Sequence, residues 1–316
     1  MPQWGVVGTE VLGGNMTMSR PIRILLQTTI PTTEDDWSIE RFSLLSDYLA
    51  SLKDENGNPL CEVTARDREE DAEGNDPVLS TLGDSDFDEL WLFALDTGGG
   101  LSPQDCAGIT TFHQRGKGIF TTRDHQDMGA CMCGLGSLGA LHFFQSKQQH
   151  PDEADRCIDD IYTKTISWPN YHSGRNGDYQ TITPIEPIHE LLHNPNSPSG
   201  RIEFFPAHPH EGAVGVPLAA TNARAIARGK SLVSGRPFNL AVAVESIKDE
   251  HGNQLGRAVA ESTFHHFVDY NWDIDKGCPS FVEEAPGDGM KNNPRALEDI
   301  KTYVRNLVLW LAPAAL

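Results

Sequence analysis

The stretch Gly118–Gly129, GIFTTRDHQDMG, carries the clearest fold signal in this 316-residue chain. Its first five residues form an apolar, β-branched run typical of a buried parallel strand, and the run ends abruptly at Arg123. In open α/β sheets, ligands bind beyond the carboxyl ends of such strands. The sequence therefore predicts that Asp124 and His125, which follow directly, lie at a functional site.

Upstream of this stretch, strand and helix signals alternate with short connections. Similar apolar runs predict three earlier strands, at 22–29, 61–65 and 89–95. Ser38 and Ser102 each precede a helical pattern, and Pro103 suits a first helical position. The charged segment 66–76 is expected to be solvated surface. Four strands separated by helices predict a parallel, doubly wound sheet.

Downstream, the pattern is less regular. A helix is predicted at 134–147, whereas residues 150–200 are rich in Pro, Asn, Asp and Ser without a clear period. Further elements are predicted as strands at 201–205, 239–245 and 257–264 and as a last helix from Asn293-Pro294.

The expected organisation is one α/β domain at 21–316 with an irregular insertion at about 148–200, which covers the site. Residues 1–20 are expected to form a flexible arm.

Composition narrows the classes of partner. The chain has 45 acidic and 25 basic residues, a net charge of −20, which repels phosphate backbones and anionic lipids. Nucleic acid and membranes are therefore not expected partners, and a small polar ligand is. Six cysteines without a CxxC pair favour reduced thiols, and no stretch is apolar enough to span a membrane. A cytoplasmic protein is expected, and the sequence leaves open whether it forms a homo-oligomer.

Three histidine-containing segments lie at or just after predicted strands. They are Asp124–Asp127, Pro206–Gly212 and Ser262–His266. Strand ends on one side of a sheet converge, so these imidazoles and carboxylates are expected to face one cleft. Such a cluster can act in acid/base chemistry or bind a divalent metal. The alternative is that each histidine only binds loop backbone.

The same segments resemble a known family. The sequences GIFTTRDHQDMGACMCG (118–134), FFPAHPHEG (204–212) and GRAVAESTFHHF (256–267) resemble an uncharacterised branch of the class I glutamine amidotransferase-like superfamily, near the trehalose-utilisation (ThuA-like) proteins. The resemblance covers roughly 22–267 and implies a flavodoxin-like three-layer α/β/α sandwich with a mostly parallel sheet. It also implies a carbohydrate-like or amide substrate.

One feature of the amidotransferase pattern is missing. Members that use glutamine carry a cysteine in a G-x-C-x-G elbow directly after the fourth strand, where this chain has Arg123, Asp124 and His125. Cys131 and Cys133 lie further along the chain. The sequence therefore predicts that the protein is not a functional glutamine amidotransferase.

If the protein is an enzyme, the residues favour a small-molecule hydrolase or lyase. His125 is the predicted general base or ligand, oriented by Asp124 or Asp127, and Glu211 is a second acid/base group. The predicted ligands of a divalent metal such as zinc are His208, His210 and His265.

Two alternatives remain at this stage. The fold could serve as a non-catalytic binding or scaffold protein. Alternatively, His189–His193 reads HELLH and matches the HExxH pattern of zinc hydrolases. In that pattern both histidines share one helical face, but Pro187 and Pro195 leave room here for scarcely two helical turns.

Overall fold

A computed structural model describes residues 20–32 and 37–314. The predicted arm at 1–20 lies outside these residues except for Arg20.

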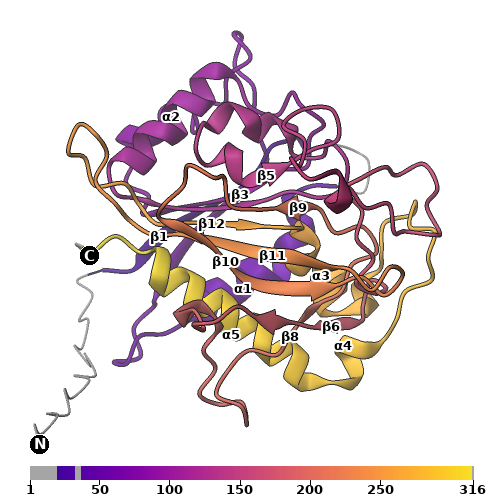
Figure 1. Cartoon of the computed structure of the whole chain (residues 1–316). Coiled ribbons are helices and arrows are strands. Elements are labelled where there is room, and N and C mark those ends of the chain that lie inside the picture. Colours follow the sequence, from indigo (N-terminus) through magenta and orange to yellow (C-terminus); the bar gives the residue numbers. More distant parts are fainter. Residues whose placement is uncertain (1–19, 33–36, 315–316) are drawn as a thin grey trace, which may run out of the picture.

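An eight-stranded mixed sheet forms the centre of the fold, in the order β2-β1-β3-β4-β12-β11-β10-β7 (Figure 1). The parallel strands are β2 (Cys61–Arg66), β1 (Ile22–Thr28), β3 (Glu89–Phe93), β4 (Gly118–Thr122) and β12 (Ala258–Glu261). Each remaining strand is antiparallel to its predecessor in that order: β11 (Pro237–Val244), β10 (Ala223–Lys230) and β7 (Thr183–Pro184). The predicted α/β class with a mostly parallel sheet is confirmed.

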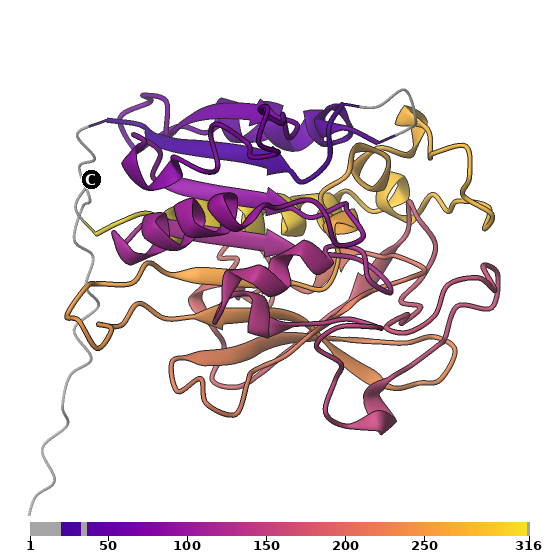
Figure 2. The ribbon, with the colours of Figure 1, turned by 90° about the horizontal axis from the view of Figure 1, so that it is seen from above.

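Helices cover both faces of the sheet (Figure 1). Helices α1 (Ser43–Ser51) and α5 (Pro294–Leu311) pack on one face, and α2 (Pro103–Gln114) packs on the other. The side chains of β3 alternate accordingly: Trp91 joins the core beneath α1 and α5, whereas Leu90 joins the core beneath α2. These are the three layers that the sequence predicts. Figure 2 shows the antiparallel orange strands at the opposite end of the sheet from the indigo N-terminal strands.

The predicted helix at 134–147 is wrong. Two 3-10 helices, Ala130–Leu135 and Gly139–Leu141, precede the short strand β5 (His142–Phe143) there. Gly136 has a φ of +56°, and a Cβ at Gly139 would lie 2.0 Å from the carbonyl oxygen of Met132. The chain therefore turns out of the helical conformation at Gly136 and packs closely against Met132 at Gly139, so no continuous helix forms.

The irregular segment at 148–200 contains little regular structure. It contributes β6 (Tyr179–Thr181), which pairs with β8 (Phe204–Pro206), and the edge strand β7. The strand β9 (Ala213–Val214) pairs with β5. Two short helices, α3 (Asp269–Trp272) and α4 (Gly289–Asn292), follow β12.

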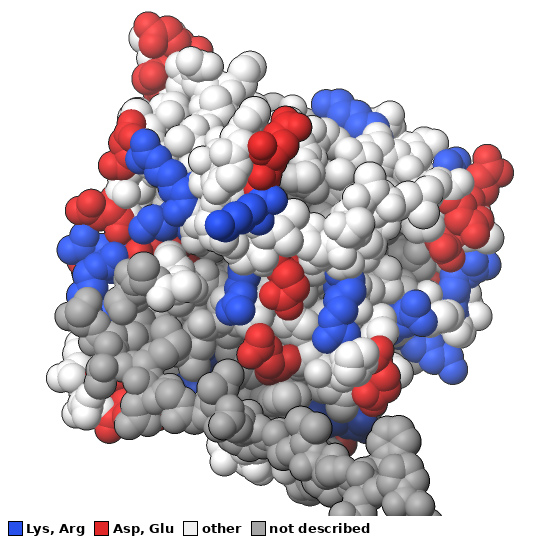
Figure 3. All heavy atoms as spheres, turned by 60° about the vertical axis from the view of Figure 1, so that its left-hand side comes forward, with Lys and Arg blue, Asp and Glu red and all other residues white. Residues whose placement is uncertain are grey.

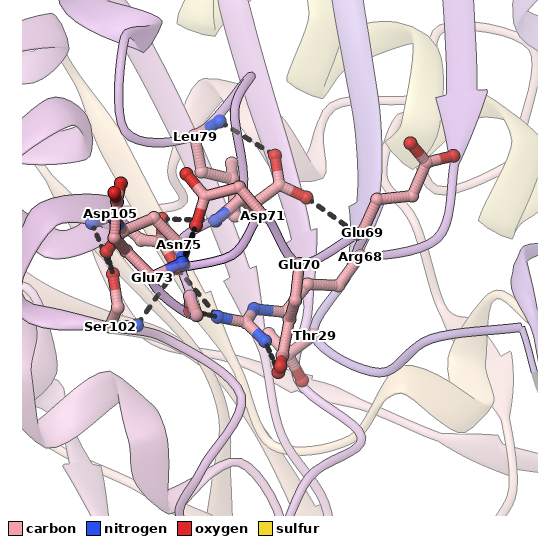
Figure 4. A network of polar contacts seen from close by, with 12 residues as sticks. Thr29, Arg68, Glu69, Glu70, Asp71, Glu73, Asn75, Leu79, Ser102 and Asp105 are labelled. Atoms are coloured by element: carbon pink, nitrogen blue, oxygen red, sulfur yellow. Dashed lines mark hydrogen bonds and ion pairs between the residues drawn. The ribbon is translucent and has the colours of Figure 1, made fainter.

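The charged segment 66–76 is not simply solvated surface. Figure 4 shows Arg68 among polar partners, and its Nη2 donates to Asp105 Oδ2 at 3.1 Å. The other oxygen of Asp105 accepts from the backbone N–H of Asp76 at 2.9 Å. Arg68, Asp76 and Asp105 are all buried. The ion pair of Arg68 with Asp105 and the hydrogen bond from Asp76 to Asp105 tie this segment to the start of α2.

On the outer surface, acidic and basic side chains are interspersed over the face shown in Figure 3. Among the described residues, no helix has both the length and the apolar character needed to cross a membrane.

Candidate functional site

The segments Asp124–Asp127 and Ser262–His266 meet because β4 and β12 are parallel neighbours, with Thr122 paired to Glu261. Beyond this pair, Thr263 Oγ1 donates a hydrogen bond to Asp124 Oδ1 at 3.0 Å. The backbone N–H of Phe264 also donates to the carbonyl oxygen of Arg123, at 2.9 Å. The expectation that these strand ends converge is confirmed.

The segment Pro206–Gly212 arrives from the loop after β8, and the irregular segment 148–200 holds it in place. The backbone N–H of His208 donates to Ser173 Oγ at 2.9 Å, and the N–H of Ser173 donates to the carbonyl oxygen of His208 at 3.1 Å. His208 and His210 thereby reach the same cavity as Asp124 and His125.

The cavity has a volume of about 520 Å³, which is large enough for a small molecule. The strand-end residues that line it are Asp124, His125, His208, His210, Phe264 and His265. Thr163, Thr165, Ile166 and Asn176 line it from the irregular segment. This segment therefore forms part of the cavity wall.

Asp124 lies at the centre of the cluster and is 1% exposed. Its carboxylate oxygens lie 2.8 Å from His125 Nδ1, 3.3 Å from His208 Nε2 and 3.2 Å from His265 Nε2. Burial by itself would raise the pKa of Asp124, but the neighbouring imidazoles outweigh it and hold the pKa well below its usual range. Asp124 is therefore a carboxylate surrounded by three imidazoles.

Three of the histidines have one ring nitrogen held by a polar partner on the side away from the cluster. The contacts are His208 Nδ1 to Asn176 Oδ1 at 3.0 Å, His265 Nδ1 to Tyr270 Oη at 2.7 Å, and His210 Nε2 to Asp160 Oδ2 at 2.6 Å. Metal-binding histidines commonly use their outer nitrogen in this way, because the contact fixes the tautomer and the ring orientation.

Two inner nitrogens lack a well-formed hydrogen bond. His208 Nε2 and His125 Nδ1 are buried without a hydrogen-bond partner in the described part of the chain. Both lie within ion-pair distance of Asp124, at 2.8 and 3.3 Å, without forming a hydrogen bond to it. Buried orphan nitrogens that surround a carboxylate suit a bound cation.

Two sets of side chains place three potential ligand atoms within 4.8 Å of one another: His125, His208 and His210, and Asp124, His208 and His265. Their ring geometries differ. The rings of His208 and His265 stack in parallel, with centroids 3.5 Å apart and an interplanar angle of 10°. The ring of His210 is nearly perpendicular to those of His125 and His208, at centroid distances of 5.3 and 5.2 Å.

The structure places Asp127 and Glu211 away from this cavity lining. Asp127 accepts hydrogen bonds from the backbone N–H and the hydroxyl of Ser146, at 2.9 and 2.6 Å. Glu211 is completely buried and bonded on all sides. Its partners are Ser173, Gln180, Ser262 and His266.

The HExxH pattern does not form a zincin site. Only Glu190–Leu192 is helical, as a single 3-10 turn, and His189 and His193 flank it in extended conformations. His189 Nδ1 instead accepts the backbone N–H of Leu191 at 3.2 Å. Without a continuous helix the two histidines do not share a face, and this alternative is wrong.

The cysteines near β4 are unsuited to nucleophilic attack. Arg123–His125 occupy the turn after β4, where an amidotransferase elbow would carry its thiol. Burial raises the pKa of Cys131 well above its ordinary value, and burial also raises that of Cys133. Both thiols therefore stay protonated at neutral pH.

The residues that sequence reasoning missed are the outer partners Asp160, Asn176 and Tyr270, together with Trp37 at the cavity wall. Asp160 and Asn176 lie in the segment without a periodic pattern, so no local signal distinguished them. Tyr270 lies five residues after His265 and in a different helix, a spacing that no helical period marks, so the sequence did not distinguish it either.

No family model matches the chain, and no curated protein is significantly similar to it in sequence. Among solved structures, the N-terminal domain of mmIFT52 is 10% identical with a TM-score of 0.47, covering 80% of this chain and 94% of that one. The cytoplasmic protein STM3548 from Salmonella typhimurium is 8% identical, with 92% and 100% coverage and a TM-score of 0.44.

The glutaminase domain of Trypanosoma brucei CTPS, with bound acivicin, is also a structural neighbour, with 13% identity and a TM-score of 0.39. It covers 90% of this chain and 94% of that one. Because all three TM-scores lie below 0.5, the site's own residues must carry any functional argument.

Proposed function

We propose that this protein is a metal-dependent hydrolase in which His125, His208 and His210 bind a divalent cation, with zinc as the best candidate. The observation that carries the proposal is the arrangement of these rings. Imidazoles bind zinc at about 2.0–2.1 Å, so tetrahedral ligands place their ring centroids about 5.2 Å apart. The centroid of His210 lies 5.3 Å from that of His125 and 5.2 Å from that of His208.

The same argument disfavours His265 as a ligand alongside His208. An imidazole binds a metal in its own ring plane, through the nitrogen lone pair. Parallel rings with centroids 3.5 Å apart cannot both contain the metal in their planes. The proposed ligand set therefore keeps His208 and His210 from the sequence prediction and replaces His265 with His125.

The remaining residues suit hydrolysis. A three-histidine zinc site keeps a fourth position open for water and lowers the pKa of that water to about 7. His265 lines the cavity, and its Nε2 lies 3.2 Å from Asp124 Oδ2. In the proposal, the Asp124 carboxylate would accept a proton from the attacking water and return it to the leaving group, and His265 would hold that carboxylate in position. Bonds to amine or alcohol leaving groups need that proton.

The substrate class and the ThuA-like relationship remain part of the proposal. Their support is the resemblance of the three histidine segments to that family, which suggests a carbohydrate-like or amide substrate. The cavity volume of about 520 Å³ agrees with a small substrate.

The test is the metal content of the full chain, purified without chelator or nickel and then supplied with zinc and dialysed. We expect one zinc per chain in the wild type and a loss of at least 100-fold in affinity in His208→Ala, because a buried ligand is removed. His193→Ala is the matched control, since His193 is exposed and outside the cavity. Circular dichroism verifies that each variant is folded.

Two results would overturn the proposal. One is a wild-type protein that fails to retain stoichiometric zinc, which would favour a non-catalytic binding protein. The other is equal zinc affinity in His208→Ala and the wild type.

A further inference from the structure

The cavity has an aromatic wall that leads away from the histidines. The ring of Trp37 contacts His265 edge to face at a centroid distance of 5.5 Å. The ring centroid of Trp37 also lies 6.5 Å from that of Phe281, with the planes tilted by 36°. Phe281 is 59% exposed, so this wall extends from the cluster to the solvent.

Acidic side chains accompany the aromatic wall. Glu283 and Glu284 follow Phe281 in the chain and line the same cavity. Glu284 is buried, and its Oε2 lies 3.0 Å from His172 Nε2, which fixes the carboxylate in place. Among the described residues that line the cavity there is no lysine or arginine.

An aromatic wall with carboxylates beside it favours a ligand group that carries a positive charge. The face of an aromatic ring attracts cations, and the attraction increases when water is partly excluded. A carboxylate fixed beside such a face adds an ion-pairing partner, whereas it repels an anionic group. A neutral sugar could stack on Trp37 but would make no use of the negative charge at Glu283 and Glu284.

We infer that the substrate carries a protonated amine, held between Glu283, Glu284 and the aromatic wall of Trp37 and Phe281. The cleaved bond then lies toward His125, His208 and His210 at the inner end of the same cavity. This inference rests on the proposed metal-dependent hydrolase and adds the substrate class to it.

The experiment uses three hydroxamates, which bind zinc through the same group and have tails of equal length. They are β-alanine hydroxamate with an ammonium tail, butyrohydroxamate with a methyl tail and succinate monohydroxamate with a carboxylate tail. Calorimetric titration into the zinc-loaded full chain should give about tenfold tighter binding of the ammonium probe than of the methyl probe, with the carboxylate probe weakest.

Substitutions then locate the source of the preference. Glu284→Gln should reduce the ammonium-to-methyl ratio by about threefold or more and leave butyrohydroxamate binding unchanged. Glu283→Gln is a second variant at an exposed position, in case loss of the contact with His172 disturbs folding. Glu250→Gln, in a remote exposed turn, is the matched control.

The outcomes separate this inference from the proposed function. Equal affinities for the three probes, or tightest binding of the methyl or carboxylate probe, would overturn the amine preference and leave the metal site standing. An unchanged ratio in both glutamate variants would overturn it as well. Failure of zinc itself to bind would overturn the proposed function, and the present inference with it.

Discussion

Two adjacent histidines, His265 and His266, belong to clusters with opposite properties. His266 is fully buried, and its two ring nitrogens each lie 3.3 Å from a carboxylate, Glu211 on one side and Glu261 on the other. His265 faces the cavity, where Asp124 is the only carboxylate among the described residues within ion-pair distance of it. The two histidines therefore differ in how many carboxylates lie within ion-pair distance of the ring: two for His266 and one for His265 among the described residues.

The closed cluster consists of Glu211, Glu261 and His266, and both ring nitrogens of His266 lie near a carboxylate. The open cluster consists of the cavity residues Asp124, His125, His208, His210 and His265. Burial by itself would lower the pKa of His266, but Glu211 and Glu261 outweigh it and raise that pKa to about 9. Each carboxylate has further partners: Tyr303 Oη donates to Glu261 Oε1 at 2.5 Å, and the hydroxyls of Ser173 and Ser262 donate to Glu211. In the open cluster, His208 Nε2 and His125 Nδ1 lack hydrogen bonds. The comparison shows that a histidine with a carboxylate at each ring nitrogen holds the fold together, whereas histidines with unbonded ring nitrogens at a cavity can accept a ligand.

The largest effect should come from opening the closed cluster. Glu211→Ala leaves a buried, charged His266 with one carboxylate, and we expect a loss of about 3–5 kcal/mol in the free energy of unfolding. Urea denaturation measures it, with Glu250→Ala at an exposed site as control. Zinc content should stay at one per chain, because Glu211 does not line the cavity.

Glu211→Gln distinguishes this structural role from the acid/base role that the sequence suggests. It keeps the shape and the hydrogen bonds to Ser173 and Ser262. A folded Glu211→Gln protein without turnover would contradict the comparison and support the acid/base role.

A smaller effect is expected at the outer partner of the open cluster. Asp160→Asn replaces the carboxylate that lies 2.6 Å from His210 Nε2, and zinc affinity should fall about 10- to 100-fold. The asparagine oxygen can still accept the backbone N–H of Tyr162 but not that of Thr163, which Asp160 accepts with its other oxygen, so the free energy of unfolding should fall by only about 1 kcal/mol. Competition with a chromogenic chelator measures the affinity. Reduced stability with unchanged affinity would show that Asp160 belongs with the closed type of cluster.

The effect that is smallest at neutral pH concerns His142, a buried histidine without a carboxylate partner among the described residues. Burial, followed by the charge of Arg123, lowers the pKa of His142 to about 3. As the pH falls, the imidazole of His142 is therefore protonated in the unfolded chain before it is protonated in the folded protein. The stability that the neutral His142 contributes is complete above about pH 6.5 and is lost as the pH falls toward 3.

In His142→Gln, the free energy of unfolding should depend less steeply on pH in that range, by about 1.4 kcal/mol per pH unit. Urea unfolding between pH 4 and 6 measures the slope, and His251→Gln at an exposed position should leave it unchanged. An unaltered slope in His142→Gln would mean that His142 is already protonated in the folded protein.

Local sequence patterns were sufficient to predict the strands of the parallel half of the sheet. The apolar runs that became β1, β3 and β4 are short and uninterrupted, and Ser102 forms the predicted cap of α2 as a capping box with Asp105. Strand β10, which lies between β11 and the edge strand β7, was missed because its residues, ARAIARGK, are only partly apolar. At 134–147 the composition suggested a helix, but the glycines within it produced turns.

The sequence by itself determined that Asp124 and His125 follow a buried strand and that three histidine segments lie at strand ends, because strands and their ends leave local patterns. Only the tertiary structure decided which histidines meet. It placed His265 at the cavity and His266 between two buried carboxylates, and it separated His189 from His193 by ending their helix after one turn. Side-chain contacts between residues as distant as Asp160 and His210 depend on how the irregular segment folds over the sheet, and no local periodicity encodes that path.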